Sequence, residues 1–280
     1  EQLRAAVTEY EGERLMLLSD ISQGLHTGLD FPSDLLDVQL REVVRNSRRV
    51  MSAARKFQLT YSEQTECHHQ SEGPPLKSLI FSLQRDQDRL QRYAGRTLRA
   101  VEHITDTFET LNLHSRLAIV VPDAVFRRDF HPLLESALAT TYQGRFALAT
   151  AADASRMCVT ATGETAQKEM IVMDDVEQMD GMEWLIAICV DLDTRADASS
   201  ASGMVFAEAR SKLYRGVTRA HMMVLAVNEF IRNGWLAYLA AVRLVEGRKF
   251  NAQEAPAQIS EEDKAQMEAE DEQRREHEAA

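Results

Sequence analysis

Arg219 stands between a predicted helix, which carries Leu213 and Val217, and a predicted apolar strand over residues 222–227. This position places its guanidinium at the rim of a sheet, where it could bind a phosphate through two parallel hydrogen bonds. Rims of open α/β sheets are the usual place for ligands. The sequence therefore predicts an anion-binding arginine at this rim.

A second group of basic residues stands where a loop is expected to meet a helix. Arg45 precedes a helix whose apolar positions begin at Val50, with Ser47 as its cap, and Arg48 and Arg49 lie in the first turn. The helix dipole disfavours cations in the first turn unless an anionic group lies nearby. An anion site and a solvated basic turn both remain open.

Acidic residues gather in the segment 174–183, between two predicted strands. Carboxylates bind Mg²⁺, but the spacing does not require a metal, so a surface loop is the preferred interpretation for Asp175 and Glu177. Glu183 directly follows Gly181 and Met182 at the mouth of a buried strand. A carboxylate in that position can accept hydrogen bonds from a sugar hydroxyl.

The cysteines indicate no disulfide framework and no metal centre. Cys67 and the two histidines that follow it have no second Cys/His cluster at zinc-like spacing, so no metal site is predicted. Cys189 lies in an apolar strand, and the irregular spacing of the three cysteines favours an intracellular, reducing compartment. The longest apolar run, 184–190, is far below the ~20 residues of a membrane span, so we expect no membrane association.

Charge is distributed unevenly along the 280 residues. The chain carries a net charge of −12, of which residues 251–280 contribute −7 through ten acidic and three basic side chains. The body is therefore not a strongly basic nucleic-acid binder, and any nucleic-acid contact would have to be local. The tail itself, poor in large apolar residues, is expected to be a solvated helix or disordered.

Short buried strands alternate with amphipathic helices, which is the pattern of a parallel α/β sheet. We predict a three-layer α/β/α fold with a mainly parallel sheet and a small-residue loop over 194–203. The predicted strands are 14–18, 78–83, 116–121, 146–149, 170–173, 184–190 and 222–227. The predicted helices include 84–112, 124–139, the segment ending at 218 and 233–245.

Four stretches, taken in order, resemble motifs of the superfamily 1 helicases, specifically the UvrD/Rep-like and Schlafen-type domains. Leu17-Leu-Ser-Asp-Ile-Ser-Gln23 resembles motif III, and Val43-Val-Arg-Asn-Ser47 resembles motif IV. Asp180-Gly-Met-Glu-Trp184 resembles motif V, and Leu213-Tyr-Arg-Gly-Val-Thr-Arg-Ala220 closely matches motif VI. The resemblance covers roughly residues 14–230 and implies the carboxyl-terminal, RecA-like (P-loop NTPase-like) lobe of a helicase.

The resemblance also implies roles for residues of the catalytic machinery. Arg45 and Arg219 would be the arginine fingers that approach the γ-phosphate from the second lobe. Gln23 would couple the state of the nucleotide to the groove that binds the nucleic-acid strand.

For nucleotide binding, the resemblance implies that Glu183 holds the ribose and that Gly181 gives close backbone approach. Asp20 of motif III would belong to the same nucleotide-binding set, and Thr218 would lie near the coupling surface. Ser19 in place of Gly, and Asp180 in place of Lys, depart from the family pattern.

No Gly-x-x-x-x-Gly-Lys-Ser/Thr sequence occurs in the chain, so a backbone cradle for phosphates is missing. By the family plan, ATP with Mg²⁺ would be bound mainly by a first lobe upstream of Glu1, and this chain alone should not hydrolyse ATP. We expect residues 1–36 to be a remnant of that lobe, 37–250 the second lobe and 251–280 the acidic tail. The expected partners are the upstream lobe and single-stranded DNA or RNA.

Two alternatives remain at this stage. The chain could be a non-catalytic helicase-like module kept for protein contacts, which the departures at Ser19 and Asp180 and the acidic net charge favour. It could also be an unrelated α/β enzyme that uses Asp174, Asp175 or Asp191 with a metal.

Overall fold

The computed structural model describes the chain in several ranges, and the positions outside them include some of the predicted features. The described residues are 42–58, 66–83, 88–154, 168–193, 202–231 and 234–237, with only the backbone at 202–206. The strand 14–18, Asp20 and Gln23, most of the helix 233–245 and the acidic tail lie outside these ranges.

A six-stranded sheet forms the centre of the molecule, and every pair of neighbouring strands in it is parallel. The strand order is β3-β8-β7-β4-β6-β5. The strands are β3 (Lys77–Phe81), β4 (Leu117–Val121), β5 (Phe146–Ala149), β6 (Glu169–Asp175), β7 (Trp184–Val190) and β8 (Ala220–Glu229). All five residues of β4 are buried, as expected for a central parallel strand covered on both faces.

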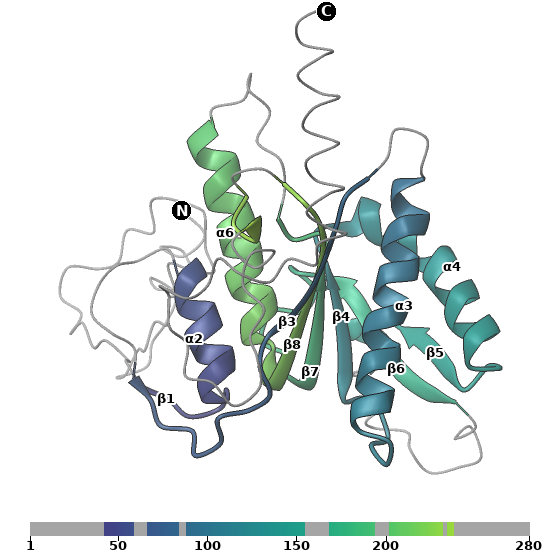
Figure 1. Ribbon diagram of the computed structural model, residues 1–280, viewed down its shortest axis with the longest axis horizontal. Helices are drawn as coiled ribbons and strands as arrows, with labels where there is room; N and C mark the ends of the chain where they lie inside the picture. Colours follow the sequence, from purple (N-terminus) through teal and green to yellow (C-terminus); the bar gives the residue numbers. More distant parts are fainter. Residues whose placement is uncertain are drawn as a thin grey trace, which may run out of the picture.

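Helices cover both faces of this sheet (Figure 1). On one face α3 (Arg89–Thr107) and α4 (Ala124–Thr141) pack over a core that includes Ile119 and Ile188. On the other face α2 (Arg48–Phe57) and α6 (Ser202–Thr218) pack over a second core that includes Val120 and Val224. Alternate residues of a strand point to opposite faces, so a strand can contribute side chains to both cores. The predicted three-layer α/β/α fold is confirmed, and it is consistent with a RecA-like lobe.

The segment before β3 contains a small sheet of its own. Two short strands, β1 (Glu42–Val43) and β2 (Glu66–Cys67), pair in parallel beside the main sheet. This pairing fixes the chain on both sides of α2, and it brings the residues that follow β1 against the start of β8.

α6 begins at Ser202, where a loop through residue 203 was expected. The reason is topological rather than local. β7 and β8 are parallel neighbours, so the chain must cross back over the sheet between them, and such a crossover is usually a helix. Within the described residues, no helix combines the length and the apolar composition that a bilayer crossing requires.

Candidate functional site

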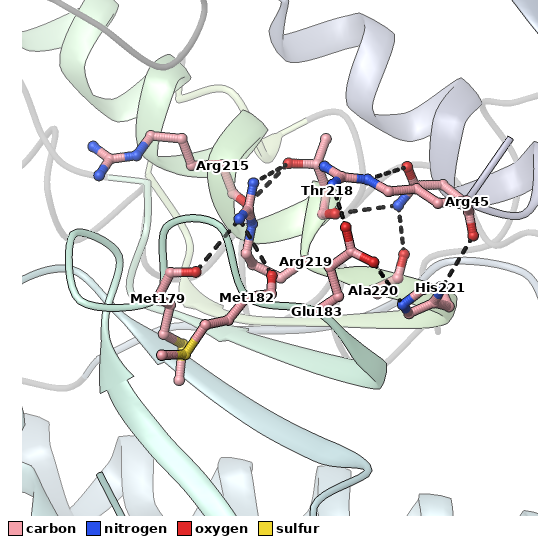
Figure 2. Close-up of polar contacts among 10 residues, drawn as sticks. Arg45, Met179, Met182, Glu183, Arg215, Thr218, Arg219, Ala220 and His221 are labelled. Atoms are coloured by element: carbon pink, nitrogen blue, oxygen red, sulfur yellow. Dashed lines mark hydrogen bonds and ion pairs between the residues drawn. The ribbon is translucent and has the colours of Figure 1, made fainter. Parts of the chain in front are cut away.

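Three predicted site residues, Arg45, Glu183 and Arg219, meet at the amino ends of β7 and β8 (Figure 2). Glu183 directly precedes β7, and Arg219 lies between α6 and β8. The two segments are joined where Trp184 N donates to Arg219 O at 2.9 Å. Arg219 therefore lies at a rim of the sheet, but this rim is the amino edge and not the usual ligand-binding edge that was predicted. Open parallel sheets usually bind ligands at the opposite, carboxyl edge.

Glu183 is shared between two basic side chains. Its Oε1 pairs with Arg45 Nη1, and its Oε2 lies 3.1 Å from His221 Nε2. The other ring nitrogen of His221 lies 3.2 Å from Arg45 O. The Arg45 and Glu183 side chains are 38% and 33% exposed, so this pair is accessible from solvent. A carboxylate and a guanidinium thus stand side by side at an open corner of the sheet.

Arg219 is held differently, because it is 2% exposed and bonds only to neutral oxygens. Its Nε donates to Arg215 O at 3.1 Å, and its Nη1 donates to Met182 O at 3.3 Å and Met179 O at 3.4 Å. Figure 2 shows these carbonyls around the guanidinium. Within the described part of the chain, no carboxylate bonds to this buried cation.

The pKa of Arg219 reflects the lack, among the described residues, of a carboxylate bonded to it. Burial lowers its pKa, and the neighbouring charge of Arg45 lowers it further, while Asp180 and Glu183 act in the opposite direction. Two guanidinium groups close enough to repel each other mark a place where an anion would be stabilised. Arg45 and Arg219 therefore lie close enough at this corner for their charges to act on each other.

Two further residues that the resemblance assigned to the nucleotide lie in the same corner. Thr218 is 5% exposed, and its Oγ1 donates to Arg215 O at 3.1 Å. Gly181 has a φ of +78°, in the left-handed region that glycine adopts most easily, and a Cβ there would meet no atom within 4 Å. Open space therefore lies beside the backbone at Gly181. Gln23 and Asp20 lie outside the described residues.

Asn46 anchors the arginine segment, although nothing in the sequence pattern singled it out. Its side-chain amide is buried and donates to Ala220 O at 2.6 Å and Thr218 O at 3.2 Å. Ser47 stands at the predicted N-cap position of α2, but its hydroxyl makes no cap bond and donates instead to Met222 O at 3.1 Å. Both side chains tie the segment of Arg45 to the start of β8. The sequence analysis did not single out His221 either, because its partner Arg45 is distant in sequence.

The remaining basic and metal-like residues near this corner have local partners. Arg48, in the first turn of α2, pairs with Glu72 at 3.1 Å. The negative charge of Glu72 offsets the unfavourable interaction of this cation with the helix dipole. His68 lies 3.4 Å from Glu66, and the thiol of Cys67 donates to Asn46 O at 3.5 Å. Across the ranges that the structure describes, no three His, Cys, Asp or Glu side chains converge on a common metal position.

Asp180 takes the place of the family's lysine in motif V, and it has a partner inside the chain. Its Oδ1 accepts from Arg215 Nε at 3.1 Å, and Figure 2 shows Arg215 turned away from Arg45 and Glu183. The substitution therefore joins the turn before β7 to α6 through an ion pair. This role is structural in the described chain.

The carboxylates that favoured a metal enzyme lie at the opposite, carboxyl edge. Asp174 pairs with Arg127, and Asp191 accepts from Arg89 Nη2 at 2.7 and 2.8 Å. Asp175, predicted to lie in a surface loop, is instead 5% exposed and accepts from Gln178 N at 3.1 Å, because β6 continues through it. These carboxylates are bound separately, in an arrangement that brings no metal ligands together.

The fold and the site define a three-layer α/β protein with two arginines and a glutamate at the amino edge of its sheet. No protein-family model and no curated protein matches the chain. Among solved structures it is similar to the C-terminal domain of a possible DNA helicase from Lactobacillus plantarum WCFS1. The TM-score is 0.41 at 11% identity, and the alignment covers 66% of this chain and 87% of that chain.

Proposed function

We propose that the chain is the second RecA-like lobe of an ATP-dependent nucleic-acid helicase or translocase, with Arg45 and Arg219 as its arginine fingers. The observation that supports this most directly is the meeting of Arg45, Glu183 and Arg219 at one corner of the sheet. They come from the three stretches that resemble motifs IV, V and VI. Arg45 and Glu183 are 138 positions apart in the sequence. Charged side chains from distant segments are expected to meet where they bind one ligand together or hold those segments together.

The residues of the corner fit a nucleotide phosphate. Arg219 is a buried cation bonded to carbonyl and hydroxyl oxygens, so an anionic oxygen near it would meet a positive charge that no bonded carboxylate neutralises. ATP bound with Mg²⁺, mainly by the first lobe, supplies the phosphoryl group that is transferred to water. Arg45 and Arg219 would stabilise its negative charge, and Glu183 would accept hydrogen bonds from the ribose beside Gly181.

In this proposal Glu183 binds either its protein partners or the ribose of the nucleotide. In the structure its carboxylate pairs with Arg45 and His221. A ribose hydroxyl that bonds Glu183 would weaken its hold on Arg45, whose side chain is already 38% exposed and can turn toward a phosphate. Gln23 and Thr218 would couple this change to a single strand of DNA or RNA, as the family resemblance implies.

The test is nucleic-acid-stimulated ATP hydrolysis by the native protein that contains this chain with its upstream sequence. We expect Arg219→Ala to lower kcat by about 10³-fold and Arg45→Ala to lower it by a similar amount, as loss of an arginine finger does. Arg219→Lys keeps the charge but loses the planar fork, so it should recover only part of the rate.

Arg48→Ala is the matched control, because it removes an exposed arginine three positions from Arg45 that pairs with Glu72. Its rate should stay within about twofold of wild type. Circular dichroism of each variant separates loss of catalysis from loss of folding. An ATPase rate for Arg219→Ala equal to wild type would remove the arginine-finger role.

Two observations favour the second candidate, a non-catalytic helicase-like module that binds other proteins. Arg219 is 2% exposed, and Asp180, which replaces a lysine of the family pattern, is bonded to Arg215 within the chain. On this alternative the cluster is a joint between the segment of Arg45, the turn before β7 and α6. A native protein with no ATPase activity, whose Arg219→Ala variant loses stability, would favour the module.

A further inference from the structure

A row of basic side chains runs along α3, away from the corner described above. Arg92, Arg96 and Arg99 follow one another at helical spacing, and His103 continues the row by one more turn. Lys77, from β3, joins the far end, with its Nζ 2.8 Å from His103 Nε2. We name Arg92, Arg96, Arg99 and Lys77 the α3 basic row.

The α3 basic row lies beside the strand at one end of the sheet, as far as the described residues show. β3 is the outermost strand on its side of the six-stranded sheet, and α3 lies on the face shown toward the viewer in Figure 1. Arg96 Cζ lies 5.8 Å from the centre of the Phe81 ring, at the end of β3. A guanidinium that packs on an aromatic ring keeps its positive charge, so Arg96 adds to the charge of the row.

A hollow lies among the arginines of this row. It has a volume of about 180 Å³, and its lining residues are Gln91, Arg92, Gly95, Arg96 and Arg99. Gly95 is exposed, and a Cβ there would meet no atom within 4 Å, so the backbone is open at that point. Ligand pockets for drug-sized molecules hold about 300–1,000 Å³, so this hollow suits a smaller group.

Arg92, which lines the hollow, also has an unused donor. Its Nε is buried, and within the described residues it has no hydrogen-bond partner. A buried N–H without an acceptor is unfavourable. Neither Arg92 nor Arg99 forms an ion pair with any described residue, in contrast to Arg89 one turn earlier, which binds Asp191 and Glu229.

We propose that the α3 basic row is a binding surface for the phosphate backbone of a single-stranded nucleic acid. The chain as a whole has a net charge of −12, so three adjacent arginines around a hollow form a local attraction that the bulk charge does not explain. Arginine binds phosphate oxygens through two parallel hydrogen bonds, so a row of arginines can hold a phosphodiester backbone. The described row presents no exposed aromatic ring, so the contact is to the backbone and independent of base sequence.

The length of the row matches more than one phosphate. Arg92 and Arg99 are seven residues apart on α3, about 10 Å along the helix axis. Burial and the charge of Lys77 lower the pKa of His103, so at neutral pH the binding charge comes from the arginines and Lys77. This surface is additional to the proposed ATP site, and it does not depend on Arg45 or Arg219.

The experiment measures binding of a fluorescent oligothymidylate to the full chain without nucleotide, by anisotropy at several salt concentrations. We expect Arg92→Ala combined with Arg99→Ala to weaken binding about tenfold or more. The slope of log affinity against log salt should become shallower by about 0.7 for each phosphate contact removed. Arg96 is left in place in this variant because it packs on Phe81.

The matched control removes two basic residues from the opposite face of the sheet. Arg55 and Lys56 lie exposed in the last turn of α2, so Arg55→Ala combined with Lys56→Ala changes the net charge equally. This control should keep the wild-type affinity and salt slope. Equal losses in both double variants would reduce the effect to net charge and overturn the proposal.

Two further outcomes also overturn it. One is a wild-type chain that does not bind the oligonucleotide at low salt. The other is a chain that binds polyglutamate through Arg92 and Arg99 but not the oligonucleotide, which would make the partner an acidic protein. Because no ATP is present, failure of this binding leaves the ATPase test of Arg219 unaffected, and loss of ATPase activity leaves this binding test unaffected.

Discussion

The two edges of the central sheet both bury charge, but they bury opposite charges in different ways. At the carboxyl edge, Asp174 and Asp191 are buried, and each has an arginine as its bonded partner. At the amino edge, Arg219 is buried among carbonyl oxygens, and the nearby Glu183 is used by Arg45. Asp174 and Asp191 are thus neutralised within the chain, whereas Asp193, which follows β7 and is 1% exposed, forms no ion pair with any described residue. The amino edge keeps positive charge that an anion could use.

By its unbalanced charge, the amino edge is the better candidate for an anion site, although it is not the usual ligand edge of such sheets. Carboxyl edges of parallel sheets usually bind ligands. In this chain that edge is occupied by bonded pairs, among them Asp191, which also accepts a hydrogen bond from Tyr93 Oη at 2.6 Å. The following four changes test the comparison, in order of decreasing expected effect.

The largest effect is expected for Gly73→Ala, which acts on the support of the amino edge. Gly73 has a φ of +73°, and a Cβ there would lie 2.3 Å from Ser47 Oγ and 2.8 Å from Met222 O. The left-handed conformation and the overpacking together should lower the free energy of unfolding by about 4 kcal/mol. Urea denaturation measures this loss.

Gly144→Ala is the control for the backbone conformation alone. Gly144 has a φ of +79°, but its added Cβ would meet no atom within 4 Å. It should lose only about 1 kcal/mol. Equal losses in the two variants would mean that the contact of Gly73 with Ser47 does not hold the Arg45 segment.

The second prediction concerns Asn46→Ala. The change removes the donors to Ala220 O and Thr218 O and leaves two carbonyls at a buried joint. We expect a loss of about 3 kcal/mol in the free energy of unfolding. Asn112→Ala serves as control, since Asn112 is exposed and accepts one bond from His114 N. If both variants lost the same small amount, the buried amide would not be the anchor of this edge.

The third prediction uses pH to test the carboxyl edge. Burial raises the pKa of Asp191 to about 6, against the opposing charge of Arg89. The folded state therefore keeps a proton that the unfolded state has released above about pH 4, so this carboxyl stabilises the fold at low pH. The free energy of unfolding should fall by about 2 kcal/mol as pH rises from 4 to 7.

Asp191→Asn isolates that contribution, because an amide of the same shape does not titrate. Urea denaturation of both proteins at several pH values should give a profile for Asp191→Asn that lacks the fall between pH 4 and 7. The other titratable groups that contact Asp191 are Arg89, Tyr93 and, through Arg89, Glu229. Identical profiles for the two proteins would contradict the raised pKa.

The smallest effect is expected for His221→Ala at the amino edge. His221 and Glu183 are 38% and 33% exposed, and exposed pairs contribute about 1 kcal/mol or less. Thermal denaturation should show a small loss that shrinks further in 0.5 M salt, on the order of a few tenths of a kcal/mol. A loss as large as that of Asn46→Ala would show that charge pairs, rather than the buried amide, hold the corner together.

The sequence alone determined the layers of the fold. β4 and β7 are continuous apolar runs and were predicted within one residue of their observed ends. The apolar positions of α3 recur at helical spacing, so its existence was clear, although it ends near Thr107 rather than 112. These features are local, because a strand buried on both faces, or a helix buried on one face, shows a recognisable apolar pattern within consecutive residues.

Only the tertiary structure decided which polar residues meet. Arg219 precedes β8 in the sequence, which already places it at the amino end of that strand. Only the fold brings the segment of Arg45 to the same end, through bonds of Asn46 and Ser47 to the start of β8. Asn46 and His221 bond residues more than one hundred positions away, and no spacing rule reaches that far. Asp175 was expected in solvent and is buried, because the length of β6 is set by its pairing with β4 and not by its own residues.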